Sequence, residues 1–388
     1  MSTPVVISGM GAICAAGKNI EEISASFSAG QRAPQLPTLF STALDYPVFE
    51  VKGFSARAGI MRTLALAFTA AAEALTEAGF SQGLRGMRAG VCLGTTVASQ
   101  LNNESWYTEY KNTGSASRGA VDIYLKGNIA EAFSEKFEIS GPALTVVNAC
   151  SSGSDAIGVA LSWLQFGLCD IVIAGGADEL NHVPYCGFGA LGVASRQPCM
   201  PFDRDRSGLN LGEGAGILVL EKESSARKRG SRSTLYVTGC GAAADAYHLT
   251  APRPDASGLE MAVRSALSQS GIKESDIAFI NAHGTATRDN DKAEGRLFAR
   301  MFGPKVKFIS TKGFTGHTLG AAGALEAIFA ALGLKKGWIP ANIGFANTDE
   351  ELGVAPLREK TVIKGSYALS TSLAFGGNNA ALIIEQKR

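Results

Sequence analysis

Two short segments, far apart along the chain, share one pattern. Val5–Gly11 reads VVISGMG, and Leu235–Gly241 reads LYVTGCG. Each is an apolar run that ends in Gly-x-Gly, which is typical of a buried strand with a close backbone approach. A second pair, Gly214–Glu221 and Asn378–Glu385, repeats an apolar strand of the kind that is buried on both faces. The repeats predict two halves that share one topology and pack together.

Helical patterns alternate with these strands. Ala58–Ala78 is rich in Ala and Leu and stops before Gly79. The segments 157–164 and 325–332 carry apolar residues at positions i, i+3, i+4 and i+7 of a helix. Strands that alternate with helices predict an α/β class.

The repeat also suggests where the halves divide. We expect an N-terminal half over residues 1–232 and a C-terminal half over residues 233–388. The polar segment Ser99–Gly127 fits neither the helical nor the strand period, and we interpret it as a lid-like insertion in the first half.

Composition excludes several classes of protein. The 388 residues hold 36 Lys plus Arg and 35 Asp plus Glu, so the net charge of +1 gives no reason to expect nucleic acid or an anionic membrane as partner. The first charged residue is Lys18, and no stretch of about 20 mostly apolar residues is present. We therefore expect a cytoplasmic protein. The seven cysteines include no C-x-x-C pair, which argues against a zinc site or a disulfide framework.

One cysteine has a reactive setting. Thr145–Asp155 reads TVVNACSSGSD, so an apolar strand runs into Cys150 and a helix follows at once. The positive end of the helix dipole favours a thiolate at that place. The small residues Ser151–Gly153 leave room for a substrate. An inert buried cysteine is the alternative.

Two of the four histidines lie in similar loops. His283 stands in NAHGTAT, and His317 stands in TGHTLG, each after an expected strand and flanked by Gly and Thr. His317 precedes its helical pattern by about the same distance as Cys150 precedes its own, so the repeat would bring both to one face. Hydrogen-bonded core histidines are the alternative interpretation, and that interpretation stands for His182 and His248.

Two further segments accompany these residues. Lys312 lies just before His317 and would bias the local charge or bind a carboxylate such as Glu326. Phe375 precedes Gly376 and Gly377, a pattern that would place a backbone N–H and a movable ring at a site, or form a β-bulge.

Other motifs are weaker. Gly239-x-Gly241 imitates a dinucleotide-binding turn but lacks the acidic residue about 20 positions later. Ser151 in ACSSG imitates a hydrolase nucleophile, but the first glycine of that motif is missing.

Taken together, the ordered motifs resemble the β-ketoacyl-acyl-carrier-protein synthases, the condensing enzymes of fatty-acid and type II polyketide synthesis. The likeness covers nearly the whole chain. It rests on NACSSG at 148–153, PFDRDRSG at 201–208, GEGAG at 212–216, NAHGT at 281–285, KGFTGH at 312–317 and FGGNN at 375–379.

The resemblance implies a thiolase-like fold, in which two pseudo-duplicated α/β halves form five layers in the order αβαβα. It implies a decarboxylative Claisen condensation between an acyl group on Cys150 and malonyl-acyl-carrier protein. His283, His317, Lys312, Glu326 and Phe375 would complete the catalytic set.

The same resemblance implies that the substrate contacts residues in two loops, namely Thr285, Thr287, Phe375 and Gly376. It implies no metal or organic cofactor, because the substrates travel on the phosphopantetheine arm of acyl-carrier protein. The chain would form a homodimer, or a heterodimer with a homologous subunit.

Two alternatives remain within the resemblance. The chain would be a catalytically silent partner that sets chain length in a ketosynthase heterodimer, although such partners usually lack the cysteine kept here as Cys150. A thiolase that uses coenzyme A would carry a second cysteine near its C-terminus, whereas the last cysteine here is Cys240. Acyl-chain length and pathway stay open. Arg57, Arg62 and Arg206 are candidates for surface charges that receive the acidic carrier protein.

Overall fold

The computed structural model describes residues 3–57, 60–81, 83–97, 104–117, 119 and 128–387. Its main sheet has ten strands in the order β3-β2-β4-β5-β1-β6-β12-β11-β7-β8. The first-half strands are β1 (Val5–Cys14), β2 (Ala89–Gly94), β3 (Ala143–Val146), β4 (Ile171–Asp178) and β5 (Gly214–Lys222). The second-half strands are β6 (Leu235–Ala244), β7 (Ile277–Asn281), β8 (Phe308–Ile309), β11 (Tyr367–Ala374) and β12 (Asn378–Gln386).

The two sets of strands have the same order. Counted from the middle of the sheet, each half runs first, fifth, fourth, second and third strand in chain sequence. The halves meet where β1 and β6 pair, and that pairing covers only Val5 with Val237 and Val6 with Tyr236. Two halves of one topology were predicted from the repeated segments, and the topology confirms them. The division at residue 232 stays a prediction.

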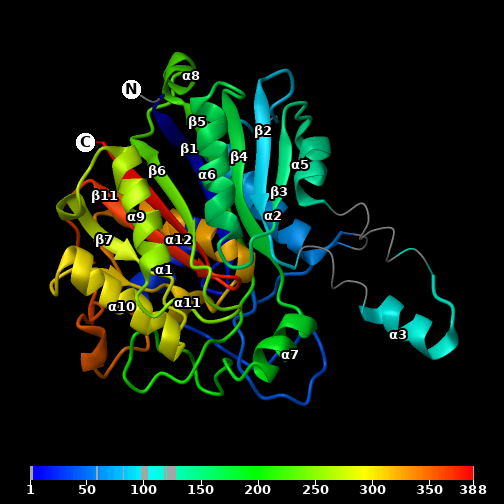
Figure 1. Cartoon of the computed structure of the whole chain (residues 1–388). Coiled ribbons are helices and arrows are strands. Elements are labelled where there is room, and N and C mark those ends of the chain that lie inside the picture. The colour runs from blue at the N-terminus through cyan, green and yellow to red at the C-terminus, as the bar shows by residue number, and fades with distance from the viewer. Residues whose placement is uncertain are drawn as a thin grey trace.

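Helices form three layers around these strands (Figure 1). α6 (Ser152–Gln165) and α12 (Ala322–Lys336) lie between the two strand sets and share one apolar core with both of them. α2 (Arg62–Ala78) and α5 (Ile129–Phe137) cover the outer face of the first set. α9 (Ser257–Ser270) and α10 (Arg288–Phe302) cover the second. The result is the expected αβαβα arrangement.

The smaller elements connect these layers. The described residues also form the helices α1 (Ile20–Ala29), α3 (Glu104–Thr113), α7 (His182–Ala190), α8 (Glu223–Lys228) and α11 (Lys312–Thr315). Short 3-10 turns are η2 (Glu274–Asp276), η3 (Leu319–Ala321) and η4 (Glu350–Leu352), and β9 (Trp338–Ile339) pairs with β10 (Thr361–Val362).

The glycines of the repeated Gly-x-Gly segments allow α2 and α9, one helix on each outer face, to pack closely against the strands. A Cβ on Gly9 would lie 2.0 Å from the carbonyl oxygen of Ala74 in α2. A Cβ on Gly239 would lie 2.2 Å from the carbonyl oxygen of Ala266 in α9. Only glycine allows helix and strand to approach so closely. The dinucleotide-like Gly239-x-Gly241 pattern is therefore a helix-packing signal.

Part of the predicted lid-like insertion lies outside the described residues, which omit 98–103, 118 and 120–127. Within it, the described helix α3 stands apart from both strand sets in Figure 1. In the described part of the chain, no helix is long and apolar enough to span a bilayer.

Candidate active site

Cys150 lies at the end of a strand-to-helix turn in the first half. The preceding residue Ala149 has a left-handed φ of 49°, and α6 begins at Ser152. The thiol is 4% exposed, and the backbone N–H of Phe375, from the second half, donates a hydrogen bond to it. The two halves therefore meet at this sulfur.

Burial is the largest influence on the pKa of this thiol. Desolvation raises the pKa of Cys150 to about 11, although Lys312 and the Phe375 N–H act in the opposite direction. The resting group is the neutral thiol. The sequence-based expectation of a thiolate considered the helix dipole and not the loss of solvent, which acts against the charged form.

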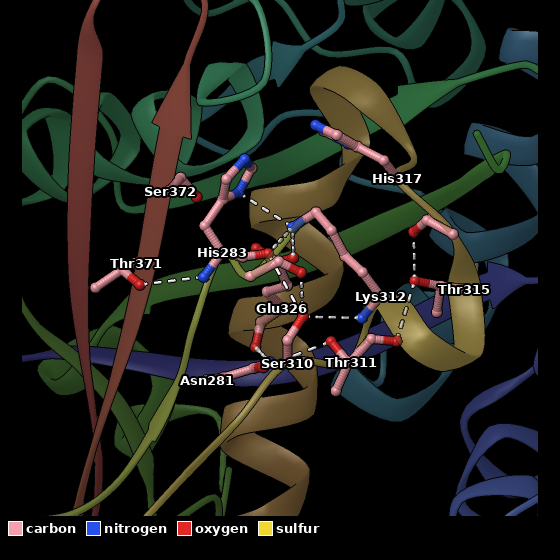
Figure 2. Close-up of polar contacts among 12 residues, drawn as sticks. Asn281, His283, Ser310, Thr311, Lys312, Thr315, His317, Glu326, Thr371 and Ser372 are labelled. Atoms are coloured by element: carbon pink, nitrogen blue, oxygen red, sulfur yellow. Dashed lines mark hydrogen bonds and ion pairs between the residues drawn. The ribbon is translucent and has the colours of Figure 1, made fainter. Parts of the chain in front are cut away.

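His283 follows β7 and is held by a buried lysine. Lys312 Nζ donates to His283 Nδ1 over 3.0 Å and to the His283 carbonyl oxygen over 2.6 Å. An ammonium group has no acceptor, so Nδ1 must carry the lone pair and Nε2 must carry the proton. Burial and the nearby Lys312 hold the pKa of His283 well below 6.5, and the ring is neutral. Figure 2 shows Lys312 beside this ring.

His317 reaches the same state through a backbone donor. The N–H of Leu319 donates to His317 Nδ1 over 3.1 Å, which again leaves the proton on Nε2. Burial, followed by the charge of Lys312, holds the pKa of His317 well below 6.5. The two imidazole rings lie edge to face, with 5.2 Å between their centroids. Two neutral N–H donors are thus placed side by side.

A buried ion pair stands behind the histidines. Lys312 and Glu326, on α11 and α12, are each 2% exposed, and Lys312 Nζ contacts Glu326 Oε1. Desolvation raises the pKa of Glu326 to about 7, against the lowering effect of Lys312. Sequence reasoning paired these two residues, and the structure brings them into contact.

One cavity joins the predicted residues of the two halves. Its volume is about 370 Å³. Its lining includes Cys150, His283, Thr285, Thr287, His317 and Phe375. Gly376 is not part of the lining, and its N–H donates instead to the carbonyl oxygen of Leu249. Within the described ranges, no group of three or more His, Cys, Asp or Glu side chains has the spacing of a metal site.

Comparison with known proteins identifies the family. The N-terminal domain of beta-ketoacyl synthases matches residues 2–226, and the C-terminal domain matches residues 235–346. The chain belongs to the beta-ketoacyl synthase family.

Individual relatives agree with this membership. A 3-oxoacyl-[acyl-carrier-protein] synthase 2 of Vibrio cholerae is 32% identical over 408 residues, which cover 98% of this chain and 99% of the relative. A synthase 2 of Staphylococcus aureus is 39% identical over 256 residues, and here the match spans 63% of each chain. The solved structure described as the ishigamide ketosynthase/chain length factor superposes with a TM-score of 0.94 at 31% identity and full coverage of both chains.

Phe188 is a cavity residue of this ketosynthase-family chain that sequence reasoning missed. It projects from α7 and stacks on Phe375, with 5.4 Å between ring centroids. The signal was present, since Phe188 stands between Gly187 and Gly189 in an apolar helix. The two rings form one apolar wall beside His317.

Outside the cavity, two histidines and two arginines differ from expectation. His182 and His248 were expected as hydrogen-bonded core residues; both are hydrogen-bonded, but neither is in the core, since the His182 side chain is 27% exposed and His248 lies at the surface. His182 pairs with Glu104 and stacks on Phe40, and His248 accepts N–H bonds from its own loop. Arg62 and Arg206 were expected as surface charges for an acidic partner. That expectation is wrong, because Arg62 binds the buried Glu213 and Arg206 binds Asp349.

Proposed function

We propose that this protein catalyses the decarboxylative Claisen condensation of an acyl thioester, held on Cys150, with malonyl-acyl-carrier protein. One observation carries the proposal: Cys150, His283 and His317 line a single cavity, and both imidazoles offer an Nε2–H donor. The product is a β-ketoacyl-carrier protein. The pathway would be fatty-acid or polyketide synthesis.

The first step is transfer of the acyl group to Cys150. The sulfur attacks the thioester carbonyl of acyl-carrier protein, the C–S bond to the carrier breaks, and the thiol proton passes to the departing carrier thiolate. The N–H groups of Cys150 and Phe375 would receive the oxyanion, since the Phe375 N–H already reaches the sulfur. One such donor is typically worth about 3 kcal/mol.

The second step needs a different kind of stabilisation. Malonyl-carrier protein loses CO₂, and the electron pair of the broken C–C bond moves into an enolate. Neutral His283 and His317 donate to the enolate oxygen through Nε2–H, and the carbanion then attacks the acyl carbonyl on Cys150. The Cys150 sulfur leaves as a thiolate and takes up one proton from solvent. Imidazoles that were charged at rest would not match the geometry, in which Lys312 donates to Nδ1 of His283.

Two partners follow from this reaction. Acyl-carrier protein would present its phosphopantetheine arm to the cavity, where Thr285 and Thr287 lie 2.8 Å apart through their hydroxyl groups. A homologous subunit would pair along β3, which is one of the two edge strands of the main sheet. Leu144 in β3 is 42% exposed and the neighbouring Val147 is 66% exposed. That subunit is a second copy or a related chain.

A silent, chain-length-setting role is the second candidate. It is favoured by the likeness to the structure described as the ishigamide ketosynthase/chain length factor. The catalytic role has the stronger support, because the buried nucleophile, both donors and the Lys312–Glu326 pair are all retained.

Mass spectrometry of the intact protein separates the two candidates. After incubation with an acyl-carrier protein that carries an acyl chain, the active enzyme gains one acyl group, and Cys150→Ala gains none. Addition of malonyl-carrier protein then removes the acyl group and yields the β-ketoacyl product. A wild-type chain that never becomes acylated, alone or with its partner subunit, overturns the proposed function in favour of the silent role.

A further inference from the structure

Asp178, the last residue of β4, is fully buried and binds segments from both halves. Its Oδ1 accepts from the Thr95 hydroxyl over 2.6 Å and from the Val97 N–H over 3.0 Å. Its Oδ2 accepts from the Thr96 N–H over 2.9 Å and from the Gly320 N–H over 2.6 Å. Thr95–Val97 follows β2 in the first half, whereas Gly320 precedes α12 in the second.

The first of these segments reaches the Cys150 turn. The Thr96 hydroxyl donates to the Ala149 carbonyl oxygen over 3.0 Å. Ala149 is the left-handed residue directly before Cys150. Asp178, through the Thr96 amide, therefore supports the backbone that sets the position of the sulfur.

The second segment reaches His317. Gly320 follows Leu319, whose N–H donates to His317 Nδ1. Leu319 has a left-handed φ of 52°, a conformation that is unfavourable for leucine and that persists only when its surroundings enforce it. The bond from Gly320 to Asp178 holds the next peptide unit and so keeps the Leu319 N–H aimed at the imidazole.

Close packing leaves no slack between the two segments. A Cβ on Gly320 would lie 2.7 Å from the Thr96 nitrogen and 2.8 Å from Asp178 Oδ2. A Cβ on Gly153, in the first turn of α6, would lie 2.8 Å from the Gly320 carbonyl oxygen. The Cys150 turn and the His317 loop thus pack backbone against backbone, and the carboxylate of Asp178 lies between them.

We propose that Asp178 is a positioning residue that keeps the Cys150 turn and the His317 loop in register and fixes the Nε2–H tautomer of His317. The role of this register in condensation rests on the proposed function. A displacement of about 1 Å between reacting groups is enough to lower a rate about 100-fold. Asp178 contacts neither His283 nor His317, but through these loops it would affect the rate of condensation.

Asp178→Asn tests the idea because it keeps the shape and removes one acceptor. An amide accepts at one oxygen only. Oδ1 accepts from the Thr95 hydroxyl and the Val97 N–H, and it also accepts from the Thr96 N–H over 3.1 Å. The amide oxygen of the variant is expected to take this place, so the NH₂ group takes the place of Oδ2, faces the Gly320 N–H and releases the His317 loop. We expect acylation of Cys150 to stay within about 3-fold of wild type, and condensation to fall about 10- to 100-fold.

The tautomer of His317 gives a second readout that a general loss of stability would not produce. In ¹⁵N-histidine spectra, wild type should show His317 protonated on Nε2, and Asp178→Asn should show a mixture of tautomers. Glu221→Gln is a matched control, since Glu221 is equally buried but binds Arg229.

Thr96→Val covers the case in which Asp178→Asn does not fold. It removes the hydroxyl that holds Ala149, so acylation should fall at least about 10-fold while the His317 tautomer is unchanged. The ¹⁵N-histidine spectra report the His317 tautomer even if the protein is not an active enzyme. They therefore separate failure of the positioning role from failure of the proposed function. The positioning role would be overturned if the His317 tautomer were unchanged in Asp178→Asn. It would also be overturned if acylation and condensation fell by the same factor in Asp178→Asn, which is what a general loss of stability would produce.

Discussion

The loops that precede α6 and α12 have equivalent places in the two halves but carry different chemistry. The first places Cys150, and the second places His317. Desolvation is the largest influence on both groups: it raises the pKa of the thiol to about 11 and holds the pKa of the imidazole well below 6.5. In both halves of the duplicated scaffold, burial therefore favours the neutral form of the side chain. We call this the common electrostatic rule. The side chains themselves differ, since one is a nucleophile and the other a hydrogen-bond donor.

Removing the donors should separate the tasks of the two halves. We expect His283→Ala and His317→Ala each to lower condensation about 10²- to 10³-fold, because each takes away one donor to the enolate oxygen. Acylation of Cys150 should change less than about 10-fold, since its oxyanion donors are backbone N–H groups. Rates of acyl transfer and of product formation, measured on the same samples, provide the comparison.

His182→Ala is the matched control for the histidine variants. His182 lies outside the cavity and pairs with Glu104, so both steps should proceed at wild-type rates. If the cavity histidine variants lose acylation as severely as condensation, the division of tasks between the halves is wrong.

The ion pair behind the second-half donors offers the next test. Lys312→Met should leave Glu326 buried without its cation and reduce stability by about 3–5 kcal/mol. Condensation should fall about 10- to 100-fold, because His283 Nδ1 loses the donor that fixes its tautomer. Urea unfolding and the condensation assay measure these two effects.

The double variant Lys312→Met/Glu326→Gln distinguishes charge balance from catalysis. It should recover much of the lost stability, since no lone charge remains buried, but it should not recover condensation. Recovery of both would show that Lys312 only compensates Glu326 and has no part in holding His283.

How far the sequence predicts this molecule depends on the range of the interactions. The repeated segments predicted the two halves, because strand period and Gly-x-Gly are local signals, and the glycines prove to be where α2 and α9 touch their sheets. The grouping of Cys150, His283 and His317 was expected from motifs and from the repeat. The neutral charge state of the thiol, Phe188 and Asp178 were not foreseen, because each depends on burial or on contacts between segments far apart in the chain.

The repeated glycines allow a test of equivalence in the scaffold. Gly9→Ala and Gly239→Ala should each reduce stability by about 3 kcal/mol, because the new Cβ would overlap a carbonyl of α2 or α9. Thermal unfolding should show similar losses for the two variants. Gly187→Ala is the control, since its Cβ would meet no atom within 4 Å and alanine favours the helix by about 0.5–1 kcal/mol. A loss in only one half would show that the two helix–strand contacts are not equivalent.

The smallest expected effect concerns pH: His283 and His317 should not titrate between pH 8 and pH 6. Because burial and Lys312 hold the pKa of His283 and His317 well below 6.5, both rings should stay neutral from pH 8 down to pH 6. Their ¹⁵N signals should keep the Nε2–H pattern over this range, whereas histidines in the unfolded chain titrate near pH 6.5. The unfolded state alone then takes up protons, so these two residues favour the folded state less as the pH falls below about 6.5.

The same spectra test whether burial or Lys312 keeps these rings neutral. Desolvation is the larger influence on both, so Lys312→Met should raise both pKa values only in part and leave the rings neutral at pH 7. A wild-type ring that becomes protonated near pH 6.5 would show that the cavity is wet in solution. Burial would then no longer explain both the thiol of the first half and the imidazoles of the second, and the common electrostatic rule would fail.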